Sequence, residues 1–559
     1  MQMIQPQYLT LSKLLDARLF RIPEYQRAYS WTSQERGDLF TDILKVHTES
    51  PNDGHFMAAI VCLRRSKQVL GTDEYHVVDV VDGQQRITTL LILLNAIKLS
   101  LNKTLKNTEA KLAREIAELL VKTEGDELLL LQTNHDTSRH FATYLRKGVA
   151  KEPKTAKTIA DRELLQAVED CRAFITLWKT QGGSLVELAA LLKNRLYFLL
   201  HEVESEKAVY TVFEVLNSRG LDVSWLDRLK SILMGAAFDL KKGNTKGLVS
   251  ELHSTWRSIY SVIGLRQGLS TEALRFAATL LADEPPSRPL GEKDSVALLR
   301  SKASDAKHIR EVGDWLLRVT KACDELVANV RINAVTRISQ ARLLATAILL
   351  REDISKKDCA RLLARWEKVS FRIYGMYHYD ARTRVGDYVR LAWRVVNADL
   401  SAKAIDAEIK EIGKEFRIQG AVDELRAADC YIGWENELRY FMYRYEEHLS
   451  GVRKLNFKNE QWEKIWMESP SKSIEHIWAK SKAPAKLKHR LGNLVLLPPG
   501  LNSRLQDKDP KDKAQSYHLT GLLIAIEAAD KIDAQGWKQK QIVDREEMLL
   551  KWAAREWAD

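Results

Sequence analysis

The chain has 559 residues, of which 45% are hydrophobic and 29% are charged, as in an ordinary soluble globular protein. This composition excludes a collagen-like, wholly disordered or low-complexity chain, and no apolar run approaches the ~20 residues that a membrane span needs. Lys and Arg number 86 against 75 Asp and Glu, so the formal net charge is +11. Either a nucleic-acid partner or a solvated basic surface accounts for this excess.

The cysteines and the N-terminus indicate the compartment. Five cysteines are scattered through the chain and no two have CxxC spacing, which argues against a zinc ribbon and a disulfide framework. Residues 1–15 contain no basic segment followed by an apolar one, so no signal peptide is predicted. We therefore expect a cytoplasmic protein that makes no contact with a membrane.

The hydrophobic pattern predicts both strands and helices in the first 100 residues and mostly helices after them. Strand-like stretches at 55–63 and 74–81 lead through a polar turn into a helical stretch at 84–99. The later expected features are mostly helix over 103–240 with a strand at 197–203, a Pro-rich linker at 283–289, helices over 295–450, a strand at 493–497, Pro turns at 498–500 and 509–510, and a helix at 536–557.

The turn from Asp82 to Arg86 is the sharpest pattern of the first half. It joins a predicted strand to a helix N-terminus, where free N–H groups and the helix dipole favour an anion. Gly83 permits a close approach of a phosphate, and Arg86 can clamp phosphate oxygens. Gln84 and Gln85 can hydrogen-bond a phosphate, and Asp82 can hold a metal ion or a ribose hydroxyl. Turn geometry alone is the other explanation for an Asp-Gly pair.

Two further clusters flank this turn in the sequence. Residues 22–31 contain two Tyr, a Trp, a Gln and an Arg, which can stack on bases and bind phosphate or guanine, or can pack at a helix start. Residues 213–222 contain Asn217 and Arg219 before Gly220, a pattern typical of a helix end. Capping explains Gly220 fully and Arg219 less well.

Three motifs thus occur in order: Pro-Glu-Tyr-Gln-Arg at 23–27, Asp-Gly-Gln-Gln-Arg at 82–86 and Leu-Asn-Ser-Arg-Gly at 216–220. Through them, residues 1–240 resemble the N-terminal domain of GmrSD-type, modification-dependent (type IV) restriction enzymes, which is similar in fold to the ParB/sulfiredoxin group. The resemblance implies that a nucleoside triphosphate (NTP) is bound and hydrolysed at Asp82, Gly83, Gln84, Gln85 and Arg86. It implies modification sensing by Tyr25, Gln26 and Arg27, and marks Asn217 and Arg219 as family motif residues. The chain has no GxxxxGK[ST] motif, so NTP hydrolysis of the P-loop kind is excluded.

A second constellation lies near the C-terminus, where Glu475-His476 precedes Asn493 and Asn502. Strand alternation puts Glu475 and His476 on opposite faces, so only a bend or loop would bring them together. Phosphodiester hydrolysis needs a base for water, which an imidazole provides, and a divalent cation, which carboxylate and amide oxygens bind. A buried structural Glu-His pair and a solvated basic face are the alternatives. The intervening basic residues are Lys480, Lys482, Lys486, Lys488 and Arg490.

This series resembles the ββα-metal (HNH-like) nuclease domain that accompanies the N-terminal domain in the same family, and it covers about residues 430–559. The resemblance implies that His476 is the general base and that Glu475 and Asn502 bind Mg²⁺ or another divalent metal. The remaining implied roles are orientation of His476 or its loop by Asn493 and contact with the scissile phosphate by Lys511 or Lys513.

We therefore predict a mostly helical α+β chain with three parts. These are a ParB/sulfiredoxin-like, NTP-binding and modification-sensing domain with helical additions at 1–240, a helical spacer at 241–430, and an HNH-like nuclease domain with flanking helices at 431–559. The predicted function is NTP-regulated, modification-dependent cleavage of double-stranded DNA, phage DNA in particular, and a homodimer is left open as its assembly. The alternatives are a non-catalytic DNA-binding NTP switch with a degenerate nuclease fold and an adaptor whose helical middle binds a protein.

Overall fold

The computed structural model describes residues 6–23, 28–48, 54–70, 72–101, 108–122, 128–133, 139–204, 224–240, 245–264, 266, 268–455 and 460–559. The chain divides into two compact units, the first comprising residues 1–274 and 292–320 and the second 275–291 and 321–559. Helices predominate in both, so the predicted mostly helical α+β class is confirmed. Within the described ranges, no helix combines the length and apolar character that a bilayer span requires.

Among the described residues, the first unit contains a six-stranded mixed sheet in the order β1-β8-β3-β4-β2-β7. Its strands are Gln7–Thr10 (β1), Arg18–Ile22 (β2), His55–Leu70 (β3), Asp73–Asp82 (β4), Leu131–Thr133 (β7) and Leu196–Val203 (β8). The β8–β3, β2–β4 and β2–β7 pairs are parallel, and β1–β8 and β3–β4 are antiparallel. A separate short pair joins β5 (Val121–Lys122) and β6 (Leu128–Leu129). The predicted early strands are confirmed, and β3 is longer than expected because it continues into a hairpin with β4.

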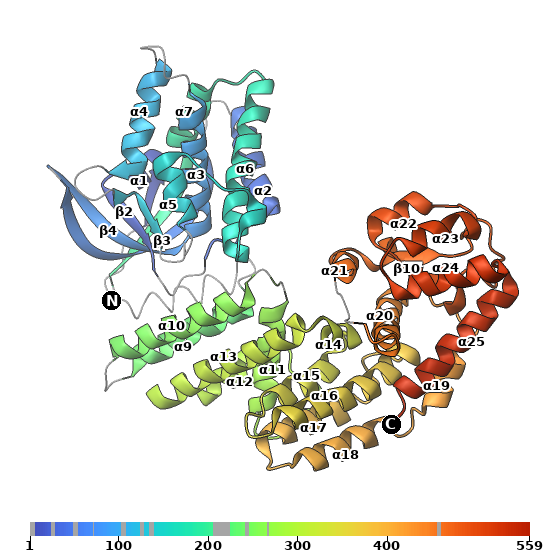
Figure 1. Cartoon of the computed structure of the whole chain (residues 1–559). Helices are drawn as coiled ribbons and strands as arrows, with labels where there is room; N and C mark the ends of the chain where they lie inside the picture. The colour runs from blue at the N-terminus through green and yellow to red at the C-terminus, as the bar shows by residue number, and fades with distance from the viewer. Residues whose placement is uncertain are drawn as a thin grey trace. The chain divides into compact units, whose positions relative to one another are not determined.

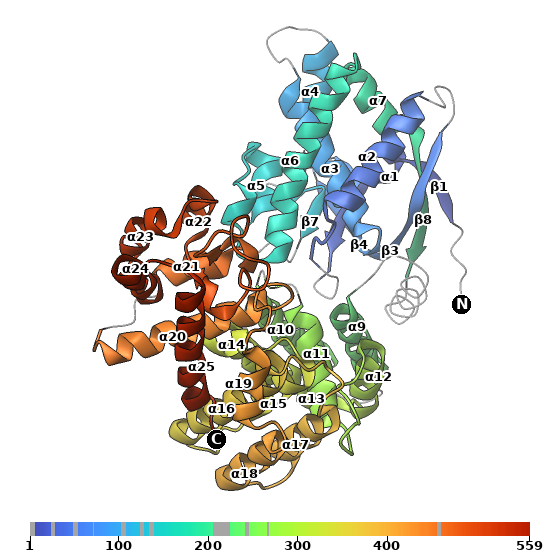
Figure 2. The ribbon, with the colours of Figure 1, turned by 90° about the vertical axis from the view of Figure 1, so that its right-hand side faces the viewer.

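Helices gather on one face of this sheet (Figures 1 and 2). They are Leu11–Leu15 (α1), Ser33–Thr48 (α2), Gln84–Ser100 (α3), Thr108–Leu120 (α4), His140–Lys147 (α5), Ile159–Thr180 (α6) and Leu185–Arg195 (α7), with a 3₁₀ turn at Pro153–Thr155. Helix α3 is buried on nearly all sides because it packs against the sheet core and against α4, α6 and α7. The polar turn therefore leads directly into a buried helix.

The next helices lead from the first unit into the second. They are Trp225–Asp239 (α9), Thr245–Ile263 (α10), Leu269–Leu281 (α11), Glu292–Lys302 (α12) and Ala306–Ala328 (α13), and α11 and α13 both cross the division between the units. The Pro-rich stretch 283–289 is irregular, as expected. Its end is fastened to α11, because the Leu290 amide donates to Thr279 Oγ1 over 3.0 Å and the Leu290 carbonyl accepts from Arg275 Nε over 2.8 Å.

The second unit is built mainly of helices, as predicted for residues 295–450. They are Val330–Val335 (α14), Ser339–Leu349 (α15), Lys356–Ser370 (α16) with a π-helical continuation at Phe371–Met376, Val385–Asn397 (α17), Ala402–Gly413 (α18), Ile418–Leu425 (α19), Glu435–Val452 (α20), Glu460–Met467 (α21), Leu523–Gln535 (α24) and Gln539–Glu556 (α25). Buried Glu367 on α16 accepts from Tyr440 and Arg444 on α20, so these helices share a satisfied polar contact within the core.

A small antiparallel hairpin lies among the last helices. It pairs β9 (Ile474–His476) with β10 (Leu494–Leu496), after 3₁₀ turns at Pro470–Lys472 and Leu491–Asn493. The hairpin is followed by α22 (Pro499–Leu505) and α23 (Pro510–His518). The Pro turns expected at 498–500 and 509–510 are instead the first turns of these helices, since proline is tolerated where a helix N–H has no partner. The predicted strand near 493–497 and the last helix are confirmed.

Candidate active site

The polar turn after β4 has the predicted strand, turn and helix order. Gly83 has φ +91°, the left-handed region that glycine adopts without strain, and it directly precedes α3. A Cβ atom at Gly83 would lie 2.9 Å from Ile60 Cγ1. The Gly83 amide donates to the Asp82 carboxylate over 2.8 Å. Backbone conformation and packing against Ile60 both require glycine at this position.

The Gln85 side chain joins this turn to the segment that follows the 23–27 motif. Its Oε1 accepts from the Ser30 amide at 2.9 Å, and its Nε2 donates to the Ala28 carbonyl at 3.1 Å. One helical turn farther along α3, Thr89 Oγ1 lies 2.8 Å from the Tyr29 hydroxyl. Residues 28–30 are therefore fastened to the first turns of α3, and the Gln85 amide serves this contact.

Some predicted residues cannot be located. Tyr25, Gln26 and Arg27 of the first motif, and Asn217 and Arg219 of the third, lie outside the described residues. The structure nevertheless describes both flanks of the first motif, because Ile22 ends β2 and residues 28–30 contact α3. The described segment that follows the first motif, residues 28–30, is thus in contact with the helix that follows the second motif.

Arg86 and the glutamines lie at the start of α3. The Arg86 guanidinium carbon is 5.5 Å from the Trp31 ring centroid, which is a cation–π distance. Burial lowers the pKa of Arg86, and nearby Asp82 and Asp42 offset this only in part. An arginine guanidinium nevertheless stays charged at neutral pH. Gln84 and Gln85 line a cavity of about 30 Å³. That volume suits water molecules, so a triphosphate does not fit inside the cavity.

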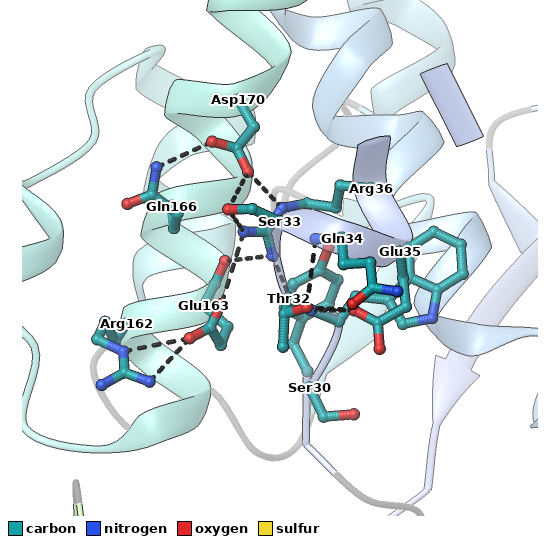
Figure 3. Close-up of polar contacts among 12 residues, drawn as sticks. Ser30, Thr32, Ser33, Gln34, Glu35, Arg36, Arg162, Glu163, Gln166 and Asp170 are labelled. Carbon is teal, nitrogen blue, oxygen red and sulfur yellow. Dashed lines mark hydrogen bonds and ion pairs between the residues drawn. The ribbon is translucent and has the colours of Figure 1, made fainter. Parts of the chain in front are cut away.

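A buried arginine fixes the start of α2, just after the segment that contacts α3 (Figure 3). Arg36 is fully buried, and its Nε donates to Asp170 Oδ2 on α6 over 2.8 Å. Ser33 Oγ donates to the same oxygen over 2.9 Å, and Arg36 also pairs with Glu163 at 3.5 Å. This network holds residues 31–36 against α6. The charge pattern of the sequence does not predict the Arg36–Asp170 pair, because the two residues are 134 positions apart.

In the second unit, the Glu475-His476 pair lies on the β9–β10 hairpin. The register pairs His476 with Leu494 and Glu475 with Val495. The two side chains contact different residues on opposite faces of β9, as strand alternation predicts. Among the described residues, no hydrogen bond joins the His476 imidazole to the Glu475 carboxylate or to the Asn502 amide.

Glu475 is 5% exposed and is held by α23. Its Oε1 lies 2.6 Å from Lys513 Nζ and accepts from the Tyr517 hydroxyl at 3.1 Å. Burial raises the pKa of Glu475, and Lys513 opposes that rise. Lys513 also donates to the His476 carbonyl over 2.8 Å and is fully buried, so a phosphate cannot reach it in this conformation. Lys511, on the same helix, is exposed.

His476 is 8% exposed and lies in an aromatic cluster. Its Nε2 is 3.0 Å from His489 Nδ1, and the Tyr431 ring meets it edge-on with a centroid distance of 4.8 Å. Burial lowers the pKa of His476 to about 3, with His489, Lys480 and Lys513 contributing in the same direction. The imidazole is therefore neutral at physiological pH, the form that can accept a proton. The sequence interpretation did not include His489 or Tyr431.

Asn493 precedes β10 and is fully buried. Its Oδ1 accepts from the Trp478 amide at 2.9 Å, and its Nδ2 donates to the carbonyls of Trp478 at 3.0 Å and Lys488 at 2.9 Å. Arg545 fixes the flanking backbone by donating to the carbonyls of Gly492 and Leu494. Asn493 thus ties together both ends of the loop 478–488 that leaves β9 directly after His476.

Asn502 on α22 makes hydrogen bonds through its amide nitrogen but not, among the described residues, through its amide oxygen. Its Nδ2 donates to the carbonyls of Lys472 at 2.8 Å and Ile474 at 3.2 Å, whereas its buried Oδ1 has no hydrogen-bond partner among the described residues. The Glu475 carboxylate and the Asn502 amide oxygen are of the hard oxygen type that Mg²⁺ prefers as ligands. The described residues contain no group of three or more His, Cys, Asp or Glu placed to hold a metal.

Two family models match the chain, one over each of the two sites. Residues 11–234 match the model of the GmrSD restriction endonuclease N-terminal domain, and residues 419–552 match that of the GmrSD restriction endonuclease C-terminal domain. No curated protein matches the chain. The first match contains the turn at 82–86, and the second contains the hairpin, Asn493 and Asn502. The two matched domains together span most of the chain and lie in the expected order, so this protein belongs to the GmrSD family of restriction endonucleases.

Proposed function

We propose that this restriction endonuclease cleaves modified double-stranded DNA in antiphage defence, with His476 as general base, a divalent metal, and NTP as regulator. The observation that carries the proposal is the Glu475-His476 pair on an antiparallel hairpin that is followed by a helix bearing Asn502. Phosphodiester hydrolysis needs a group that takes a proton from water, and an imidazole is suited to that role.

The proposed reaction consumes one water molecule. The water gives a proton to the His476 imidazole while its oxygen bonds to phosphorus, and the bond from phosphorus to one ester oxygen breaks. The products are a phosphomonoester end and a hydroxyl end, the latter protonated from solvent. When bound, a divalent cation stabilises charge on the leaving oxygen, and Asn502 Oδ1 and Glu475 Oε2 would hold it.

The loop after His476 is suited to a DNA backbone. Lys480 and Lys486 are exposed, and neither has a carboxylate partner among the described residues, whereas Lys482 pairs with Asp509 at 3.0 Å. Asn493 holds this loop at both ends. Lysines fixed beside the proposed base would bind the phosphates that flank the scissile bond. We assign Lys511, which is exposed on α23, the same kind of contact.

We place NTP binding at Asp82–Arg86 in the first unit. The α3 N-terminus and the Arg86 guanidinium favour an anion there, and the cavity volume requires that the triphosphate lie outside the space lined by Gln84 and Gln85. The Gln85 contacts give a route for coupling, since they join the turn to the segment beside Tyr25, Gln26 and Arg27. Binding at the turn would thereby bias the modification-sensing segment.

Cleavage by histidine variants tests the nuclease assignment. We expect His476→Ala to lower the rate of cutting by at least about 100-fold with Mg²⁺ present. His518→Ala is the matched control, because His518 is an exposed histidine of the same unit that contacts Asp533. Equal rates for wild type and His476→Ala would refute the assignment. Absence of cleavage by the wild-type protein on every DNA would instead indicate the non-catalytic switch.

The regulatory assignment needs a second comparison. Arg86→Ala should abolish the dependence of cleavage on NTP, whereas Arg382→Ala, at an exposed arginine that pairs with Asp380, should not. The assay uses a panel of differently modified and unmodified phage genomes with and without each NTP. Cleavage that ignores both the NTP and the Arg86 substitution would exclude this form of regulation.

A further inference from the structure

His489 is the one imidazole that contacts the proposed base among the described residues. Its Nδ1 lies 3.0 Å from His476 Nε2, and both rings are largely enclosed, with 5% of His489 and 8% of His476 exposed. His489 follows the lysine-rich loop and immediately precedes Arg490. The contact therefore joins the end of β9 to the residue that leads into the 3₁₀ turn before β10.

One ring and one backbone hydrogen bond hold His489. The Tyr431 ring stacks on it with centroids 5.0 Å apart and planes 7° apart, and Lys480 Nζ lies 5.2 Å from the Tyr431 centroid. The backbone is fixed because the His489 carbonyl accepts from the Cys430 amide over 2.9 Å. In this arrangement His489 presents its Nδ1 atom to His476.

The other nitrogens of the two rings differ. His489 Nε2 is fully buried and has no hydrogen-bond partner among the described residues. His476 Nδ1 makes no hydrogen bond with the described residues either, but it is not among their fully buried unpartnered atoms. Nδ1 is thus the nitrogen through which His476 can meet water.

We propose that His489 is a positioning residue that accepts a hydrogen bond from Nε2–H of His476 and so keeps the Nδ1 lone pair of His476 free for the water proton. Either neutral imidazole can be the hydrogen-bond donor to the other. If His489 donated from Nδ1–H, the N–H proton of His476 would lie on its Nδ1. The proposal rests on the proposed role of His476 as general base.

The proton taken from water remains on His476. Once Nδ1 of His476 takes a proton from water, Nε2–H still donates to His489 Nδ1, so His489 neither gains nor loses a proton. Its own proton stays on the buried Nε2. Because His489 touches neither the substrate nor the reacting atoms, it acts only through the orientation and tautomer of His476, as outer partners of metal-site and catalytic histidines do.

The experiment compares three substitutions with two readouts. Asparagine places an amide oxygen near the position of Nδ1, glutamine places its amide near Nε2, and leucine removes the acceptor. We expect His489→Leu and His489→Gln to lose about 10- to 100-fold in kcat with little change in KM, and His489→Asn to keep at least about tenfold more kcat than His489→Leu. Melting temperatures identify any variant that fails to fold, and His489→Asn against His489→Gln remains decisive if leucine does.

The second readout does not depend on activity. Nitrogen-15 NMR of the full-length protein labelled at histidine should show His476 as the Nε2–H tautomer, and His489→Leu should mix the tautomers. A wild-type Nδ1–H tautomer, or equal kcat for all three folded variants while His476→Ala is inactive, would overturn the positioning role. If His476→Ala cuts normally, the general-base assignment fails instead, and the NMR result still reports the tautomer.

Discussion

The turn at 82–86 and the hairpin at 474–496 use their polar side chains differently. In the first unit, the Gln85 amide is bonded through both its oxygen and its nitrogen to the backbone of residues 28–30. In the second unit, Asn493 is bonded in the same complete way, but Asn502 Oδ1 and His489 Nε2 are buried without partners among the described residues. Buried polar atoms are usually satisfied, and His489 Nε2 belongs to the ring that contacts the proposed base.

This comparison agrees with our proposal that the first site couples sensing to regulation and that the second carries out cleavage. Substitutions at the turn should mainly change stability and regulation, whereas substitutions at the hairpin should change the rate of cutting beyond their effect on stability. The following predictions test that distinction.

Asn493→Asp should give the largest effect. A carboxylate keeps the acceptor for the Trp478 amide but faces the carbonyls of Trp478 and Lys488 without a donor, which we expect to cost about 3 kcal/mol and at least tenfold in cleavage rate. Asn397→Asp is the matched control, because Asn397 Nδ2 also donates to two carbonyls, of Leu280 and Trp393, away from the hairpin. Chemical denaturation and cleavage kinetics are measured together. Parallel loss of cleavage in both variants would show that Asn493 contributes stability alone.

Gly83→Ala should destabilise the first unit by about 2 kcal/mol. The substitution forces a side chain into the left-handed region and places a Cβ 2.9 Å from Ile60 Cγ1. Gly182→Ala separates the two causes, since Gly182 has φ +87° but no atom within 4 Å of the added Cβ. Chemical denaturation should show a smaller loss of unfolding free energy for Gly182→Ala than for Gly83→Ala. Equal losses would mean that the left-handed backbone conformation alone, without the contact with Ile60, destabilises Gly83→Ala.

Gln85→Glu should cost about 1–2 kcal/mol, because it removes the donor to the Ala28 carbonyl and sets a negative charge against that oxygen. We also expect NTP to change the cleavage rate of Gln85→Glu less than that of the wild-type protein, with the maximal cleavage rate unchanged. Gln34→Glu, at an exposed position in the first turn of α2, provides the control. An unchanged NTP response in a destabilised Gln85→Glu protein would separate the 28–30 contact from regulation.

The smallest expected effect is a change in how protein stability depends on pH in the acid range when Asp170 is substituted. Burial opposes ionisation of Asp170, but hydrogen bonds from Gln166, Arg36 and Ser33 more than offset it and lower its pKa. A carboxyl whose folded pKa lies below its unfolded value stabilises the protein above about pH 4, and this stability is lost as pH falls through the folded pKa. Asp170→Asn should therefore reduce the free energy of unfolding at pH 7 by about 1 kcal/mol and flatten its acid dependence. An unchanged acid slope would contradict this reading of the Arg36 network.

Sequence reasoning located the local features and missed the contacts between distant residues. The strand, turn and helix around Gly83 follow from a β-branched run, a turn pair and helical spacing, all within one short segment. The pairing of Glu475 with Lys513 and of His476 with His489 depends on how α23 and the loop 478–488 fold back onto β9, and no periodicity encodes that. Lys513 was expected as a phosphate contact and lies instead fully buried against Glu475.

The central claim is that the two chemistries occur on different units of the chain. One reaction containing modified DNA, Mg²⁺ and NTP, in which released phosphate and new DNA ends are both counted, tests it most directly. The account predicts that His476→Ala still hydrolyses NTP but leaves the DNA intact, and that Arg86→Ala loses NTP hydrolysis. DNA ends formed by His476→Ala at the wild-type rate would contradict it.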